Sequence, residues 1–241
     1  MRVGIVSDIH ANLAAFQAVL ADMGAVDTLW CLGDMVGYGP DPNECIALLR
    51  RHEHICIVGN HDQAAIGNLD ISEFNAAAAI SARWTSQALT PESLAYLQYL
   101  PERLEWGDFT LAHGSPREPV WEYILDESGA AAGFACFDTG ACLVGHTHCP
   151  ALYRLSSVNR VTGATPGPGN CFILGDDRII ANPGGVGQPR DGDPRAAYAV
   201  LDTESRVLEW RRVAYPIQTT QDRMREATLP QSLIDRLAYG W

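Results

Sequence analysis

Residues 3–23 read VGIVSDIHANLAAFQAVLADM, a stretch that contains an apolar run, a polar loop and a helical pattern in that order. Residues 3–6 have the character of a buried strand. After Asn12, which is placed to cap a helix, apolar residues recur at helical spacing. Asp8 and His10 therefore lie where a strand ends and before a helix begins. The stretch predicts an α/β protein with polar side chains at a strand end.

Further polar fragments follow short runs of Val, Ile, Leu and Cys in the same way. Five of the seven histidines of the chain lie in these fragments. Alternation of strands and helices argues for a parallel, right-handed βαβ core. Because several strand ends then converge on one place, we expect one shared site. The fragments are Asp8-Ile9-His10, Gly33-Asp34, Gly59-Asn60-His61-Asp62, His113 and Gly145-His146-Thr147-His148.

The same patterns predict the other elements, and no Ser/Gly/Pro-rich linker divides the chain. We therefore expect a single domain over residues 1–241. Strands are predicted at 3–6, 28–32, 54–58, 109–112 and 141–144, and helices at 13–23, 42–51, 74–84, 91–100 and 230–239. Beyond residue 150, short strands with tight turns predict a second, more antiparallel sheet, with strands at 151–155, 171–175, 178–181, 197–201 and 207–213.

Composition excludes several functions. The formal net charge is −12, from 29 acidic and 17 basic residues, which argues against long nucleic acid as a partner. All basic residues are arginine, so a Schiff-base lysine and a phosphate-binding Gly-Lys-Ser/Thr loop are excluded. The seven cysteines show no paired spacing and suit a reduced core. With no room for a signal peptide and no apolar stretch of membrane-spanning length, we expect a cytoplasmic protein without a membrane partner.

The polar fragments have the composition of a metal site. Carboxylate and imidazole ligands without thiolates suit Mn, Fe, Ni, Zn, Co or Mg. Two such ions, about 3.5–4 Å apart, can hold a bridging hydroxide and clamp both oxygens of an in-line displacement at phosphorus. Asp34 is expected to bridge the two ions. The sequence therefore predicts a binuclear, metal-dependent phosphoesterase that acts on a small phosphoester.

The order D-x-H, G-D, G-N-H-D, H and G-H-x-H, from residue 8 to residue 148, resembles the calcineurin-like metallophosphoesterase superfamily. The resemblance implies a four-layer α/β/β/α sandwich of two mixed sheets flanked by helices, and it also allows a homo-oligomer. It gives His61 a catalytic role at the leaving-group oxygen, as proton donor or positive stabiliser, with Asp62 beside it. It implies that one metal is held by Asp8, His10, Asp34 and His148, and the other by Asp34, Asn60, His113 and His146.

Departures from related motifs narrow the expected function. Protein Ser/Thr phosphatases of the superfamily carry G-D-x-x-D-R-G and R-G-N-H-E, whereas residues 33–39 read GDMVGYG and residues 58–62 read VGNHD. The missing arginines and second Asp disfavour a protein phosphatase. The S-D-I-H-x-N opening and the segment 182–190 are closer to small bacterial and archaeal phosphodiesterase-like members. We expect phosphodiester or small nucleotide-like substrates, with a phosphomonoesterase or nucleotidase as the alternative; a non-catalytic scaffold of this fold is disfavoured by the complete ligand set.

Four residues are candidates for substrate binding, each with a structural alternative. Arg117 could bind phosphate through two hydrogen bonds or form a surface salt bridge. Arg190, in a glycine-rich loop, could also contact the substrate. Tyr38 could stack on a nucleobase or hold a turn against the core, and Asn12 could bind substrate or cap a helix. The same choice exists for Asp62, which could influence the neighbouring histidine or bond only to loop backbone.

Overall fold

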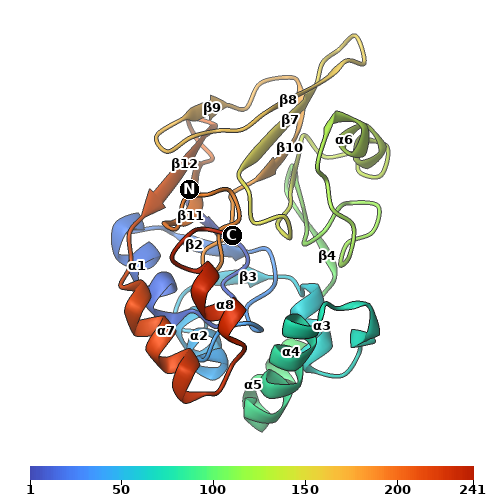
Figure 1. Cartoon of the computed structure of the whole chain (residues 1–241). Helices are drawn as coiled ribbons and strands as arrows, with labels where there is room; N and C mark the ends of the chain where they lie inside the picture. Colours follow the sequence, from blue (N-terminus) through green and yellow to red (C-terminus); the bar gives the residue numbers. More distant parts are fainter.

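Two six-stranded sheets pack against each other, with helices on their outer faces, in a computed structural model that describes residues 1–241 (Figure 1). The first sheet has the order β3-β2-β1-β11-β12-β9 and the second the order β4-β5-β6-β10-β7-β8. The strands are β1 (Arg2–Val6), β2 (Thr28–Cys31), β3 (His54–Cys56), β4 (Arg103–Trp106), β5 (Phe109–Ala112), β6 (Ala141–Leu143), β7 (Ala151–Leu155), β8 (Val161–Ala164), β9 (Cys171–Ile173), β10 (Arg178–Asn182), β11 (Ala196–Asp202) and β12 (Val207–Val213).

Four of the helices cover the outer faces of the two sheets. Helices α1, α2 and α7 pack on the first sheet's side, and α6 packs against β7, β8 and β10 of the second (Figure 1). This arrangement is the predicted four-layer α/β/β/α sandwich. The helices are α1 (Leu13–Met23), α2 (Pro42–Leu49), α3 (Asn60–Ala65), α4 (Ala76–Ala88), α5 (Pro91–Gln98), α6 (Glu127–Phe134), α7 (Ile217–Glu226) and α8 (Gln231–Arg236), with a 3₁₀ turn at Ile71–Glu73. No helix has the length and apolar character needed to cross a membrane.

Alternation along β11 shows why the protein has these layers. Tyr198 and Val200 point into the core between the first sheet and its helices, where they join Phe16 of α1. Ala199 and Leu201 point into the core between the two sheets. Successive side chains of a strand face opposite sides, so a strand that is apolar on both faces needs cover from both sides. The helices supply one cover and the second sheet supplies the other.

The prediction of a separate antiparallel sheet after residue 150 is wrong. Strands β11, β12 and β9 extend the first sheet, with β11 antiparallel to β1, whereas β10, β7 and β8 extend the second sheet, with β10 parallel to β6. Each sheet is therefore mixed. The reason lies in β11, which is apolar on both faces and so occupies a central position rather than the edge of a new sheet.

Three helices and two strands were not predicted from the sequence, namely α3, α6, α7, β4 and β8. Helix α6 has the sequence ESGAAAGF, whose small residues give little contrast between its faces. Helix α7 is rich in Gln, Thr and Arg and buries few side chains, among them Met224. Their helical state depends on packing against neighbouring elements, which the local pattern does not report.

Candidate metal centre

Loops that follow β1, β2, β5 and β6 bring the predicted metal ligands together at one edge of the two sheets. Within each group the ligand atoms lie within 4.8 Å of one another, and all six side chains are buried. The structure thus gathers residues that are as far apart as positions 8 and 148. The first group contains Asp8, His10 and His148, and the second contains Asp34, His113 and His146.

Backbone strain is concentrated in these loops. Positive φ angles, which non-glycine residues rarely adopt, occur at Asp8 (54°), His10 (48°), Asp34 (52°), His146 (64°) and His148 (61°). The strain is held in place by backbone hydrogen bonds between the loops, such as the one from the His10 amide to the Asp34 carbonyl at 2.9 Å. Strained residues of this kind persist where the surroundings fix them, and they gather at functional sites.

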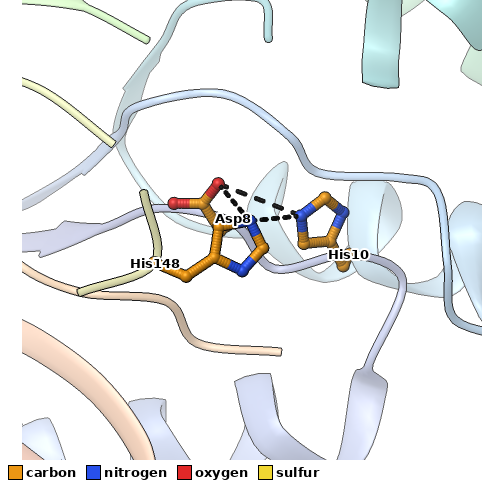
Figure 2. Close-up of side chains that lie close together, drawn as sticks. All are labelled: Asp8, His10 and His148. Atoms are coloured by element: carbon orange, nitrogen blue, oxygen red, sulfur yellow. Dashed lines mark hydrogen bonds and ion pairs between the residues drawn. The ribbon is translucent and has the colours of Figure 1, made fainter. Parts of the chain in front are cut away.

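The side chains of the first group point toward one another (Figure 2). His148 Nε2 lies 3.2 Å from Asp8 Oδ1 and 3.2 Å from His10 Nε2. His10 Nε2 lies 3.9 Å from the same Asp8 oxygen. The three ligand atoms therefore surround one point between them.

Backbone carbonyls fix which nitrogen of each histidine is available. Nδ1 contacts a carbonyl oxygen in His10 (Val36, 3.1 Å), His113 (Leu32, 2.8 Å) and His148 (Gln188, 2.5 Å). Because a carbonyl only accepts, Nδ1 carries a hydrogen in each ring, and whenever the ring is neutral Nε2 presents its lone pair. In His146 the roles reverse, since Nε2 lies 3.1 Å from the Trp121 carbonyl and Nδ1 is left free. Such partners orient metal-ligating histidines.

This arrangement fits a bound cation. Burial lowers the pKa of His10 and of His148 well below the usual value, so both rings are neutral and their Nε2 lone pairs face each other without a hydrogen between them. The buried oxygens Asp8 Oδ1 and Asp34 Oδ2 have no hydrogen-bond partner. Unpaired buried acceptors are unfavourable, and a divalent ion among them satisfies all of these atoms at once. The nitrogen and oxygen donors suit a hard or borderline ion.

Asp34 connects the two groups. Its Oδ2 lies 3.3 Å from His113 Nε2 and 3.6 Å from His10 Nε2, and its Oδ1 accepts the His61 amide at 2.8 Å. Burial alone would raise the pKa of Asp34, but the neighbouring histidines, His113 above all, together outweigh burial and hold the pKa well below its usual value. Asn60 Oδ1 lies 3.2 Å from His113 Nε2, so Asn60 adjoins the second group.

His61 lies beside the centre at the start of α3. Its ring is held between Tyr38 and Phe74, with centroid distances of 4.2 Å and 4.9 Å. Burial lowers the pKa of His61 to about 4, so the ring is neutral at pH 7. Gly37 is required here because its φ is +88° and a Cβ would lie 2.7 Å from His61 Nδ1.

Asp62 is fully buried and binds loop backbone. One of its oxygens accepts the Val36 amide and the other accepts the Gly59 amide, both at 3.0 Å. These bonds tie the loop after β2 to the start of α3, where His61 lies. Of the two interpretations of Asp62, the hydrogen bonds favour support of the loop, which acts on His61 through its position.

Arg117 and Asn12 take the structural alternatives in this structure. The Arg117 guanidinium is exposed and forms an ion pair with Glu122. Asn12 caps α1 by accepting the Ala15 amide at 3.1 Å, and its Nδ2 donates to the Gly187 carbonyl at 3.0 Å. Neither side chain is directed toward the two ligand groups by these contacts.

Arg190 and Tyr38 lie together beside the first group. Arg190 Nη2 donates to Gln188 Oε1 at 2.9 Å and lies 3.4 Å from the Tyr38 hydroxyl, so its hydrogen-bond partners are neutral. Its positive charge acts to lower the pKa of Asp8 and His61. Tyr38 is only 6% exposed and its ring lies 4.6 Å from that of His10, so most of the side chain is packed against the site, while part of it borders the cavity beside His61.

Aromatic residues that were not singled out as site candidates from the sequence line a cavity next to the second group. The cavity has a volume of about 390 Å³, and its walls include Asn60, His61, Phe74, Trp121 and Tyr123. Trp121 is 41% exposed. The sequence did carry a signal, because two aromatic residues, Trp121 and Tyr123, follow the candidate ligand His113 closely.

Comparisons with known proteins agree with this geometry. A model of the calcineurin-like phosphoesterase superfamily domain matches residues 1–206. The crystal structure of a metallophosphoesterase from Sphaerobacter thermophilus is 49% identical in sequence, with a TM-score of 0.92 over 100% of this chain and 99% of that chain. A Methanocaldococcus jannaschii protein is 34% identical over 247 residues, which are 99% of this chain and 98% of the relative. A 62-residue stretch, 24% of this chain and 22% of the relative, is 48% identical to the symmetrical bis(5′-nucleosyl)-tetraphosphatase of Pseudomonas putida.

Proposed function

The chain belongs to the calcineurin-like phosphoesterase superfamily and is a metal-dependent phosphoester hydrolase, and from this premise we propose that it cleaves phosphodiesters or small nucleotide-like phosphate esters. Calcineurin-like phosphoesterases use two divalent metal ions. The observation that carries the proposal is the pair of carboxylate-histidine groups that meet at Asp34, with each histidine tautomer fixed by a backbone carbonyl.

We assign the metal ligands from this geometry. Asp34 is the shared ligand, since its Oδ2 lies close to a histidine of each group. When bound, two divalent ions supply positive charge to phosphoryl oxygens and lower the pKa of bound water. Asp8, His10, Asp34 and His148 would hold the first ion, and Asp34, Asn60, His113 and His146 would hold the second.

His61 assists the leaving group in this proposal. Its ring forms part of the wall of the 390 Å³ cavity, and its backbone amide is fixed by Asp34 Oδ1. A neutral imidazole at neutral pH has one N–H, which can be donated to the oxygen that departs from phosphorus. Asp62 supports this role by holding the start of α3 through two backbone amides.

Arg190 supplies the protein's own positive charge to the substrate. Its guanidinium contacts neutral oxygens and so remains available for an anion. The two arginines of the protein Ser/Thr phosphatase motifs are absent. A single guanidinium suits the one negative charge of a phosphodiester better than the two charges of a monoester, and the Pseudomonas putida relative provides support for a nucleotide substrate.

The test is hydrolysis by metal-stripped protein after Mn, Ni, Zn, Fe or Mg is restored one at a time. Bis(p-nitrophenyl) phosphate and p-nitrophenyl phosphate serve as diester and monoester substrates. We expect metal-dependent turnover that favours the diester. Faster turnover of the monoester would instead identify a phosphomonoesterase, and absence of turnover while two ions bind in calorimetry would contradict the proposal. A cytoplasmic location and a homo-oligomer stay predictions.

A further inference from the structure

The segment between β5 and α6 presents apolar side chains at the metal centre. Trp121, Tyr123 and Leu125 are exposed by 41%, 48% and 73%, whereas Ile124 between them is buried. Glu122 points the other way and is bound by Ser115 Oγ at 2.5 Å and by Arg117. Exposed aromatic rings are thus displayed on one side of a segment that is anchored from the other side.

This segment is attached directly to the second ligand group. The Trp121 carbonyl contacts His146 Nε2 at 3.1 Å, and the Tyr123 ring stacks on the His146 ring with centroids 3.8 Å apart. From the opposite wall, Phe74 stacks on Trp121 at 5.5 Å and flanks His61. The aromatic walls therefore rise from the residues that are proposed to hold metal and to assist the leaving group.

The cavity between these walls has a definite charge pattern. Its volume of about 390 Å³ lies in the lower part of the range for small-molecule sites, roughly 300–1,000 Å³. No arginine lines it, and Glu73 adds a negative charge. The guanidinium of Arg190 instead lies beside the first ligand group, where it contacts Gln188 Oε1 and the Tyr38 hydroxyl. The aromatic part of the cavity repels a second phosphate and suits an uncharged planar group.

We propose that this cavity is a nucleobase subsite, in which the base of a nucleoside phosphodiester stacks on Trp121 while its phosphate lies at the metal centre. The proposal rests on the proposed phosphodiesterase function and specifies its substrate class. An aromatic face accepts any base by stacking, so Trp121 favours nucleoside esters as a class without choosing one base. It also selects against substrates that extend a polyphosphate chain into this part of the cavity.

A pair of substrates that differ only in the base tests the subsite. The methyl phosphodiester of adenosine 5′-phosphate and that of ribose 5-phosphate share the reacting group. We expect the metal-loaded enzyme to prefer the adenosine ester in kcat/KM by on the order of 10-fold or more. Trp121→Ala should remove this preference by lowering kcat/KM for the adenosine ester more than for the ribose ester, because the carbonyl that contacts His146 remains.

The matched control is Trp106→Ala, since Trp106 on β4 is also 41% exposed but does not line the cavity. This variant should keep the preference. Equal kcat/KM for the two esters in the unmodified enzyme would overturn the subsite while leaving the phosphodiesterase function intact. A loss in Trp121→Ala that is equal for both esters would also overturn it, since that result identifies a structural effect on His146. Failure to hydrolyse these esters and bis(p-nitrophenyl) phosphate alike would instead contradict the proposed function.

Discussion

The two ligand groups have similar residues but different surroundings. In the first group, His10 borders a cavity of only about 10 Å³, roughly the space of one water molecule. Beside the second group, Asn60 and His61 border a cavity of about 390 Å³ with aromatic walls. The difference indicates that substrate approaches from the side of the second group, whereas the first group is enclosed by the loops that hold it.

The groups also differ in charge when no metal is bound. His10 and His148 of the first group are neutral because burial lowers their pKa. In the second group burial acts in the same direction on His113, but the Asp34 carboxylate, together with Asp8 and the Leu32 carbonyl, outweighs burial and raises the pKa to about 9. The second group is therefore held together by an ion pair, and the first has neutral imidazoles whose lone pairs require a cation.

Asp34→Asn should have the largest effect, because it removes the ligand common to both groups and so weakens both of them. We expect a loss of kcat/KM on the order of 10³-fold or more, with weaker binding of both ions. Metal content by elemental analysis and hydrolysis of bis(p-nitrophenyl) phosphate measure the two effects. Retention of both ions and of activity would show that Asp34 is not the shared ligand.

His61→Asn should lower kcat by about 10²- to 10³-fold and leave both ions bound, since His61 acts on the leaving group from the open side. A diester with a good leaving group, such as p-nitrophenolate, should lose less than one with a poor leaving group. His54→Asn is a suitable control, because that histidine is bound to Tyr96 away from the site. Loss of metal in His61→Asn would assign the ring a structural role instead.

Asn60→Ala should make the two ligand groups differ in their affinity for metal ions. Asn60 adjoins His113 and not the first group, so we expect one ion to bind about 10- to 100-fold more weakly and the other to be unchanged. Calorimetric titration of the metal-stripped variant would show one strong and one weak binding step, whereas the unmodified protein would show two steps of similar affinity. Equal weakening of both steps would contradict the assignment of Asn60 to the second group alone.

The pH dependence of stability should give the smallest effect, and it should arise from the second group. His113 has a pKa of about 9 in the folded, metal-free protein and about 6.5 when unfolded, so its stabilising contribution is complete below pH 6.5 and is lost as the pH rises to 9. Between pH 7 and 9 we expect a loss of about 1–2 kcal/mol. His10 and His148 are already neutral there and contribute no change. Urea unfolding of the metal-free protein and of His113→Gln measures the difference, and equal pH slopes would refute it.

The sequence patterns predicted more of the candidate site than of the fold. The order of the polar fragments singled out Asp34, His113 and the paired histidines of residues 145–148, and the structure brings them together. The layer architecture was also predicted correctly. The placement of β11 was not, because the choice between a new sheet and the centre of an existing one depends on which partner covers each apolar face.

The two candidate substrate-binding arginines show that sequence position does not predict which way a side chain points. Arg117 follows His113 closely in sequence, yet its guanidinium pairs with Glu122 and so anchors the aromatic segment. Arg190 is far from the other site residues in sequence, yet its charge acts on Asp8 and His61. Proximity along the chain says little about the direction of a long, flexible side chain, which is decided by the partners that it finds.

The sequence by itself determined the metal-binding chemistry, because ligand type and strand-end position are local properties that survive without knowledge of the fold. It also determined the family and the alternation of strands and helices. Only the tertiary structure decided that one ligand group is enclosed and the other open, and that Phe74, Trp121 and Tyr123 share a cavity. These features arise from contacts between segments distant along the chain, such as Phe74 with Trp121, and burial or exposure of a side chain is set by such contacts rather than by its own sequence.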